Sequence, residues 1–189
     1  MKKIIMFPIF IAAVVLIILG IIWINAYNGE VTRNNLIEKN RGDVHAALGS
    51  RYDKVMAFID AIEGADTTVT NYLIIIKEAR TAFAEAIDNG DIIEADAEAG
   101  TIDSTFVTLL AYMEDNPASY NTVSLYAGFM SEFSAATNVV LNTIGKFNES
   151  VMSYNNHIQK FTNNMFLANK EPYATYSITN YNATLPTFN

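Results

Sequence analysis

The sequence predicts an all-α protein: an N-terminal transmembrane helix continuous with a long antiparallel four-helix bundle (two long and two shorter helices), followed by an extended C-terminal tail. Three observations predict it. Residues 4–24 are apolar and uncharged, apolar residues then recur at intervals of three and four as far as residue 165, and the final stretch is uncharged and rich in tyrosine. We therefore divide the chain into a membrane anchor (1–26), a helical bundle (27–168) and an aromatic-rich tail (169–189).

The N-terminal apolar run is long enough for a membrane helix. About 20 apolar residues cross a hydrocarbon core of about 30 Å, and residues 4–24 carry no charge. A cleaved signal peptide is the alternative, since Lys2 and Lys3 can form its basic region. The run is longer than such a peptide needs, and "INA" before Tyr27 is a poor cleavage site, so we expect a retained anchor with Trp23 and Tyr27 at the membrane interface.

Local signals delimit the first three helices of the bundle. We expect the first helix to continue from the anchor to about residue 63, where Gly64 can end it. The second helix starts at residues 66–68 and ends in the turn "DNGD" at 88–91, where Asp91 can cap the third helix. The third helix ends at "DNP", because Pro117 suits the first turn of the next helix.

The fourth helix carries an unbroken heptad pattern. Apolar residues alternate at three and four from Val123 to Met165, which is typical of knobs-into-holes packing. We expect a packing stripe, which is either core of the bundle or an oligomer contact, to consist of Tyr126, Phe133, Phe147, Val151, Tyr154, Ile158 and Phe161. Asn148 and Asn155 lie beside it, where they can hydrogen-bond a neighbouring helix and fix its register.

The tail is predicted to be ordered near the membrane. Residues 172–188 contain no charge, and a fourth helix of full length returns them towards the bilayer. Tyrosine combines an apolar ring with a polar hydroxyl, which suits the membrane interface. We therefore expect Tyr173, Tyr176 and Tyr181 at that interface.

Five stretches stand out in order along the chain: Tyr27-Asn28 after the anchor, "RYDKV" at 51–55, "EAR" at 78–80, "MEDNP" at 113–117 and "FNESVMSYNNHIQKFTNN" at 147–164. Together they resemble the LemA family of bacterial membrane-anchored helical proteins. The last matches the family pattern YN-x-x-V-x-x-YN-x-x-I-x-x-F. Phe147 replaces the usual Tyr, Thr162 the usual Pro, and "AATNVVLNTI" lacks the usual Glu and Arg. The resemblance implies a long antiparallel helical bundle on a membrane anchor and no settled biochemical activity.

Composition excludes several functional classes. Beyond Lys2 and Lys3 the chain has 10 basic residues against 20 acidic ones, so nucleic acid is not an expected partner. Cysteine is absent, and we expect His45 and His157 to be surface or groove residues rather than metal ligands. The acidic residues at 88–98 lack the spacing of a calcium loop and fit a solvated face. We expect no enzyme activity, no cofactor and no metal site.

Two functions are compatible with this pattern. The first is a non-enzymatic structural protein that contacts membrane lipid and self-assembles into a homo-oligomer through the anchor, the fourth helix and the tail. The alternative is a membrane-anchored adaptor that binds an unidentified protein partner through its acidic bundle surface. Loop charges discriminate orientation only weakly, and we expect the N-terminus in the cytoplasm and the bundle outside it.

The argument for self-assembly rests on the rings near the membrane. Two long helices alone cannot enclose Phe147, Tyr154 and Phe161, and leaving these rings in water forfeits roughly 2 kcal/mol each. The second and third helices can cover them if they extend further than their length indicates. Otherwise the cover is a neighbouring protomer, a lipid or the tail of an adjacent chain, and we expect a symmetric assembly.

Overall fold

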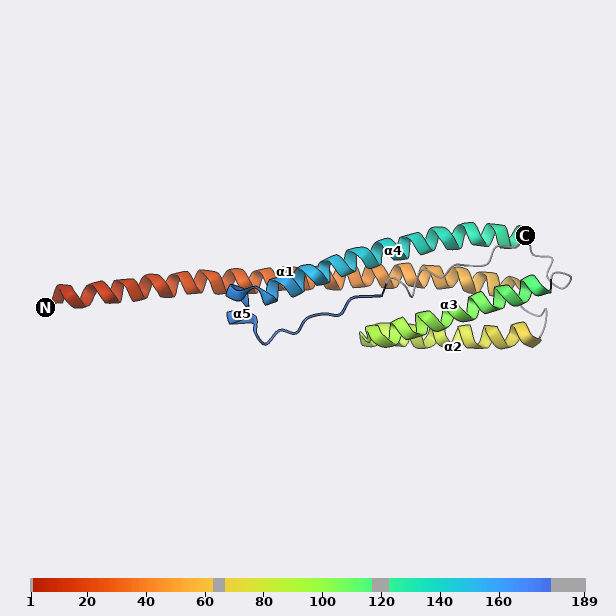
Figure 1. The fold of residues 1–189 in the computed structure, drawn as a ribbon, viewed down its shortest axis with the longest axis horizontal. Coiled ribbons are helices and arrows are strands. Elements are labelled where there is room, and N and C mark those ends of the chain that lie inside the picture. Colours follow the sequence, from red (N-terminus) through yellow and green to blue (C-terminus); the bar gives the residue numbers. More distant parts are fainter. Residues whose placement is uncertain (1, 63–66, 117–122, 178–189) are drawn as a thin grey trace. The chain divides into compact units, whose positions relative to one another are not determined.

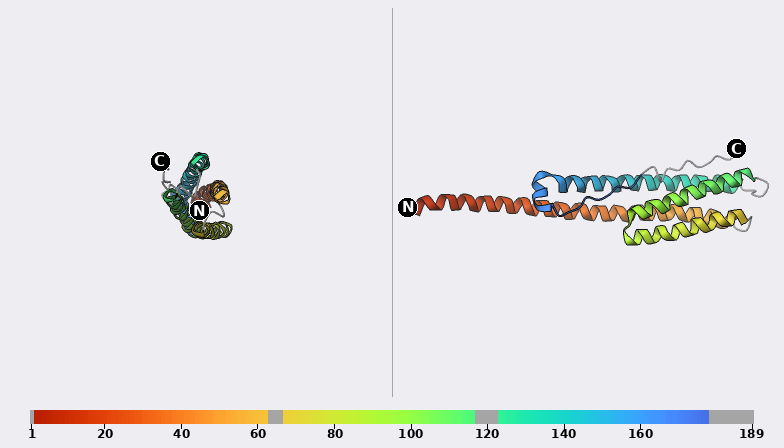
Figure 2. Two further views of the ribbon diagram at one scale, coloured as in Figure 1. Left: turned by 90° about the vertical axis from the view of Figure 1, so that its right-hand side faces the viewer. Right: turned by 60° about the horizontal axis from the view of Figure 1, so that its bottom comes forward.

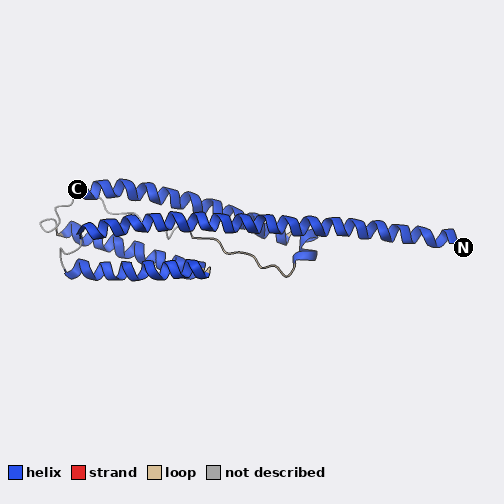
Figure 3. Cartoon of the chain, turned by 180° about the vertical axis from the view of Figure 1, so that it is seen from behind, coloured by secondary structure: helices blue, strands red, loops and turns tan. Residues whose placement is uncertain are grey.

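The computed structural model describes residues 2–62, 67–116 and 123–177. These residues form five helices and contain no strand, so the predicted all-α class is confirmed for them (Figures 1 and 3). The helices are α1 (Lys2–Ile62), α2 (Thr67–Asn89), α3 (Ile92–Asp115), α4 (Val123–Gln159) and α5 (Phe161–Leu167). The N-terminal part of α1 is long and apolar enough to cross a membrane by length and composition.

The turn between α2 and α3 is formed by the residues whose local chemistry predicts it. Gly90 adopts a positive φ of 72°, which glycine accepts without steric cost. The Asp91 side chain accepts a hydrogen bond from the Glu94 backbone N–H at 3.0 Å, so it is the N-cap of α3. The short turn lets α2 and α3 pack along each other, as two views show (Figures 1 and 2).

The chain forms two compact units, and both α1 and α4 contribute to each. Among the described residues, the first unit contains 2–39 and 148–174, and the second contains 40–62, 67–116, 123–147 and 175–177. This division differs from the sequence-based boundaries at residues 26 and 168. The reason is that residues 170–173 make their contacts with α1 and α4 and therefore belong to the first unit.

Aromatic rings from three helices form the core of the second unit. Phe58 of α1 lies 5.9 Å from Phe106 of α3 and 4.5 Å from Phe129 of α4, measured between ring centroids. Phe106 also lies 5.7 Å from Phe133. The rings interlock at tilted and edge-to-face angles, which adds to the stabilisation from burial alone. A further edge-to-face contact, with centroids 5.2 Å apart, joins α1 to α2.

A buried ion pair lies beside this core. The guanidinium of Arg51 in α1 has an Nη2 atom 3.0 Å from Oδ2 of Asp103 in α3, and its Cζ lies 4.7 Å from the ring centroid of Phe133. The Arg51 side chain has no exposed surface and that of Asp103 is 5% exposed. Burial raises the pKa of Asp103 to about 6, and the nearby Arg51 opposes this increase. Burial therefore outweighs the attraction of Arg51 for the carboxylate.

The fourth helix ends earlier than its heptad pattern predicts. The pattern continues to Met165, but α4 ends at Gln159 and Lys160 is extended, with ψ of 133°. Asn163 Nδ2 donates to the His157 carbonyl at 2.9 Å, and Asn164 Nδ2 donates to the Ile158 carbonyl at 3.3 Å. These amides satisfy carbonyls that a continuing helix would have used. The prediction of one helix through residue 165 was therefore wrong.

We predict that Asp103 gives the protein an unusual pH dependence. Its folded-state pKa of about 6 lies above its ordinary value of 3.8, so the folded protein binds this proton more tightly. The stabilisation is complete below about pH 4 and is lost as the pH rises through 6. Relative to Asp103→Asn, the wild-type free energy of unfolding should fall by up to about 3 kcal/mol over this range.

Urea denaturation of the full-length protein in detergent at a series of pH values measures this difference. Asp60→Asn is the matched control, because Asp60 is an exposed aspartate on α1, the helix that carries Arg51. A difference between wild type and Asp103→Asn that stays constant from pH 4 to 7 would contradict the assignment.

Candidate functional site

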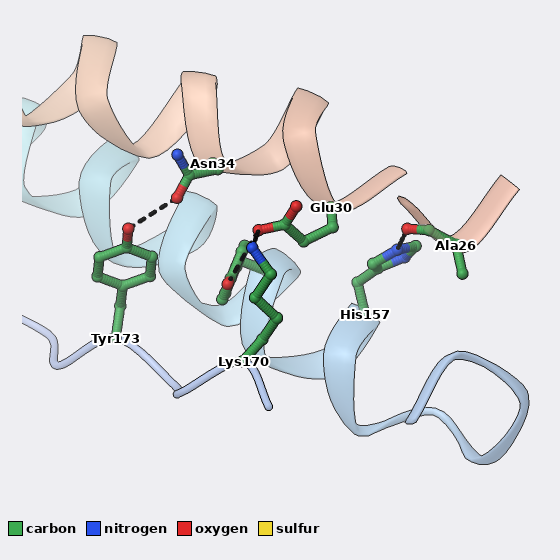
Figure 4. A network of polar contacts seen from close by, with 7 residues as sticks. Ala26, Glu30, Asn34, His157, Lys170 and Tyr173 are labelled. Carbon is green, nitrogen blue, oxygen red and sulfur yellow. Dashed lines mark hydrogen bonds and ion pairs between the residues drawn. The ribbon is translucent and has the colours of Figure 1, made fainter. Parts of the chain in front are cut away.

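The first unit contains a polar cluster on one face of α1. Ala26, Glu30 and Asn34 follow each other at four-residue spacing, so they lie along the same face of the helix. The end of α4 and the start of the tail pack against this face, and Figure 4 shows His157, Lys170 and Tyr173 directed towards it. We call these residues, with Tyr154 and Asn155 of α4, the tail clamp.

His157 attaches the end of α4 to α1. Its Nε2 lies 2.9 Å from the Ala26 carbonyl oxygen, and its Nδ1 lies 3.2 Å from the side-chain nitrogen of Asn163 (Figure 4). Because the Asn163 amide can only donate to Nδ1, the network assigns the proton to Nε2, which donates to Ala26. The ring is buried, with 8% of the residue exposed.

Gly29 makes this close approach possible. A Cβ atom at this position would lie 2.5 Å from Cε1 and 2.9 Å from Nε2 of His157, closer than carbon and nitrogen atoms approach without bonding. Glycine is needed here because the imidazole occupies the space of a side chain. Gly42, on the same helix, has no atom within 4 Å of such a Cβ.

Glu30 is a buried carboxylate with two partners. Tyr154 Oη donates to Glu30 Oε1 at 3.3 Å, and Lys170 Nζ lies 3.2 Å from the same oxygen (Figure 4). Burial, together with the nearby Glu30 carboxylate, raises the pKa of Tyr154 to about 12. The phenol therefore keeps its proton at neutral pH and remains a donor. Glu30, which is 4% exposed, is stabilised by both groups.

Asn155 and Tyr173 join the tail to α4 by two reciprocal hydrogen bonds. The Tyr173 backbone N–H donates to Asn155 Oδ1 at 2.9 Å, and Asn155 Nδ2 donates to the Tyr173 carbonyl at 3.0 Å. The Tyr173 hydroxyl donates to Asn34 Oδ1 at 2.7 Å, and its ring packs edge-to-face on Tyr154 with centroids 5.1 Å apart. Asn155 thus fixes the tail, where the sequence indicated a neighbouring helix.

In the second unit the tail covers another ring of the stripe. Tyr176 packs edge-to-face on Phe147 with centroids 5.0 Å apart, and its hydroxyl lies 3.3 Å from Nε2 of His45. Burial lowers the pKa of His45, with a further decrease from Arg41 that Asp88 opposes. A neutral imidazole can accept the hydrogen bond from Tyr176. Tyr176 itself is 2% exposed.

These contacts correct the sequence-based interpretation of the packing stripe on the fourth helix. Phe147 and Tyr154 are covered by the tail of the same chain, so their burial does not require another protomer. Tyr173 and Tyr176, predicted at the membrane interface, make packing contacts within their units instead. Phe161 is 83% exposed, because α4 ends before it. The expectation that His157 is a surface or groove residue was also wrong.

The structure places the remaining predicted residues as follows. Phe133, Val151 and Ile158 are buried, and Asn148 is half-buried on α4. Trp23 and Tyr27 are both about half exposed, and their rings stack with centroids 6.4 Å apart. Tyr181 and the side chain of Tyr126 lie outside the part of the chain that the structure describes.

The tail clamp has the chemistry of a structural joint. Its open groove, of about 450 Å³, is lined by Glu30, Asn34, Tyr154 and residues 170–174. Glu30 in this groove is already engaged by Tyr154 and Lys170. Among the described residues, no group of three or more His, Asp or Glu side chains is arranged to hold a metal ion.

Sequence reasoning missed most of the clamp. No recognised motif marks the roles of Gly29, Glu30, Asn163 and Lys170. These roles depend on contacts between segments that are distant in the sequence. The available signals were the four-residue spacing of Ala26, Glu30 and Asn34 and the absence of a side chain at Gly29. They mark a narrow helix face with polar groups just after an apolar segment.

We predict that Gly29→Ala separates α4 from α1 at His157. The added methyl group must displace a buried imidazole, which costs about 1–3 kcal/mol by overpacking. Gly42→Ala is the matched control, because its Cβ meets no atom and alanine favours the helix by about 0.5–1 kcal/mol. Chemical denaturation of the two full-length variants in detergent should therefore change stability in opposite directions. Equal stabilisation by both substitutions would contradict the contact.

Comparison with known proteins identifies the family. The family model described as "LemA family" matches residues 40–188, which is most of the chain. No curated protein and no solved structure matches. The match includes Tyr154, Asn155, His157, Lys170 and Tyr173 and begins after Ala26, Glu30 and Asn34. The chain belongs to the LemA family, which confirms the resemblance noted in the sequence.

Proposed function

We propose that this LemA family protein is a non-enzymatic, single-pass membrane protein with a structural role, in which the N-terminal part of α1 crosses the bilayer. One observation carries the proposal. The large apolar side chains from Phe7 to Ile24, except that of Ile22, are exposed, and none of the most apolar 18-residue window of α1 is buried by the chain. Each such side chain forfeits roughly 2 kcal/mol in water, so a lipid environment is strongly favoured.

The organisation of the polar groups supports a structural role. Two buried carboxylates are paired with basic side chains: Asp103 with Arg51, and Glu30 with Lys170. The two histidines also have partners, as His157 bonds the Ala26 carbonyl and His45 lies against the Tyr176 hydroxyl. Buried pairs of this kind specify how helices and tail pack, and a catalytic group would need a free position facing a substrate.

The proposed role includes self-assembly into a homo-oligomer. The anchor confines copies to a plane, which raises their effective concentration without any new contact. The tail covers Phe147 and Tyr154 within its own chain. We therefore assign the contact between copies to the anchor and the outward side of α4. Val139 is 55% and Met152 59% exposed on that helix.

The absence of cysteine makes a direct crosslinking test possible. Met152→Cys should form a disulfide-linked dimer when the full-length protein is oxidised in its native membrane, because a symmetric contact brings the same position of two copies together. Glu78→Cys on α2 is the control, since Glu78 is also exposed and lies away from the proposed contact. A monomer for Met152→Cys, or an equal yield of dimer for Glu78→Cys, would contradict assembly through α4.

An adaptor function is the second candidate, and one groove favours it. Lys54 of α1 and Glu132 of α4 form an ion pair at 2.9 Å beside an opening of about 530 Å³, which Phe58 and Phe129 also line. A small apolar floor with charges at its edge suits a segment of another protein. Recovery of a stoichiometric second protein with Glu78→Cys after oxidation, together with no disulfide-linked dimer of Met152→Cys, would favour the adaptor.

A further inference from the structure

We infer that α5 is a second membrane contact: a short helix that lies at the bilayer surface and inserts Phe161 and Met165 among the lipids. This inference rests on the proposed membrane anchor. Phe161 is 83% and Met165 62% exposed, and their four-residue spacing places both on one side of the helix. An exposed aromatic and methionine on one helix face lose hydrophobic free energy in water, so a partner for this face is expected.

The level of α5 along α1 is set by the tail clamp. His157, three residues before the turn at Lys160, is bonded to the carbonyl of Ala26. Ala26 follows the uncharged run that ends at Ile24, so α5 begins where the proposed bilayer segment meets water. Trp23 and Tyr27, stacked on each other and half exposed, lie on α1 at the same level. Aromatic residues of this kind are enriched at membrane interfaces.

The direction of α5 fits the plane of the interface. In the right view of Figure 2, α5 runs across the direction of α1 and not along it. A helix that crosses a transmembrane segment in this way lies parallel to the bilayer surface. Interfacial helices bury one apolar face about 5–10 Å into the boundary between headgroups and acyl chains.

The orientation of α5 about its own axis is fixed by its neighbours. Asn163 and Asn164 donate to the carbonyls of His157 and Ile158 in the last turn of α4. Leu167 is buried against the unit, which leaves Phe161 and Met165 pointing away from it. The helix FTNNMFL carries no charge, so the contact depends on apolar insertion and little on lipid headgroup charge.

The chain allows a test by fluorescence, because Trp23 is its only tryptophan. Full-length protein is reconstituted in zwitterionic phosphatidylcholine vesicles, with and without brominated acyl chains, which quench tryptophan by contact. Trp23 in the wild-type protein reports on the anchor. Phe161→Trp in a Trp23→Phe background reports on α5. Glu149→Trp in the same background is the control, since Glu149 is exposed on α4 about 12 Å before His157 at 1.5 Å per residue.

The expected result is loss of emission for Phe161→Trp comparable to that of Trp23, with a blue-shifted spectrum, and little loss for Glu149→Trp. Quenching of Trp23 without quenching of Phe161→Trp would overturn the inference and leave the anchor intact. A blue shift of Phe161→Trp without quenching would also overturn it, because a second protein copy would then cover the face. Equal quenching of Glu149→Trp would mean that α4 lies flat on the membrane, which contradicts a specific α5 contact. Failure to quench Trp23 would refute the anchor itself.

Discussion

Two helices lying side by side cannot bury an aromatic stripe, and the structure depends on how this constraint is met. Each ring exposes edges that a second cylinder does not reach, so a third element has to cover them. The chain uses its own tail in both units. Tyr173 packs on Tyr154 in the first unit, and Tyr176 packs on Phe147 in the second. Phe147 and Tyr154 of the packing stripe therefore pack against the tail of their own chain.

Polar groups decide where that tail lies. Hydrophobic contact alone would allow a tyrosine-rich segment to slide along the stripe, because rings repeat at regular intervals. Asn155 prevents this by pairing with both the N–H and the carbonyl of Tyr173, and Lys170 reaches the buried Glu30. Buried polar groups impose a single register because any other register leaves them unpaired. The side-chain amide of Asn155 and the carboxylate of Glu30 therefore hold the tail at one position along the stripe.

The sequence predicts those features that depend on local chemistry. The turn at Gly90, the Asp91 cap and the extent of α1 follow from neighbouring residues and from hydrophobic period. The end of α4 does not follow from the local pattern, because the heptad spacing continues through the turn. There the Asn163 and Asn164 side chains donate to carbonyls in the last turn of α4. The Arg51–Asp103 pair was also missed, since it depends on the relative register of α1 and α3. Long-range polar contacts leave no periodic signal in a single sequence.

Hydrogen–deuterium exchange of the full-length protein in lipid nanodiscs tests the central claim, that the chain closes its own aromatic stripe. The Tyr173 amide is bonded to Asn155 Oδ1, so its exchange should be slow in the wild-type protein. Asn155→Ala should return it towards the rate of an unfolded chain, while the amides of α3 keep their protection. Fast exchange at Tyr173 in the wild-type protein would contradict the account.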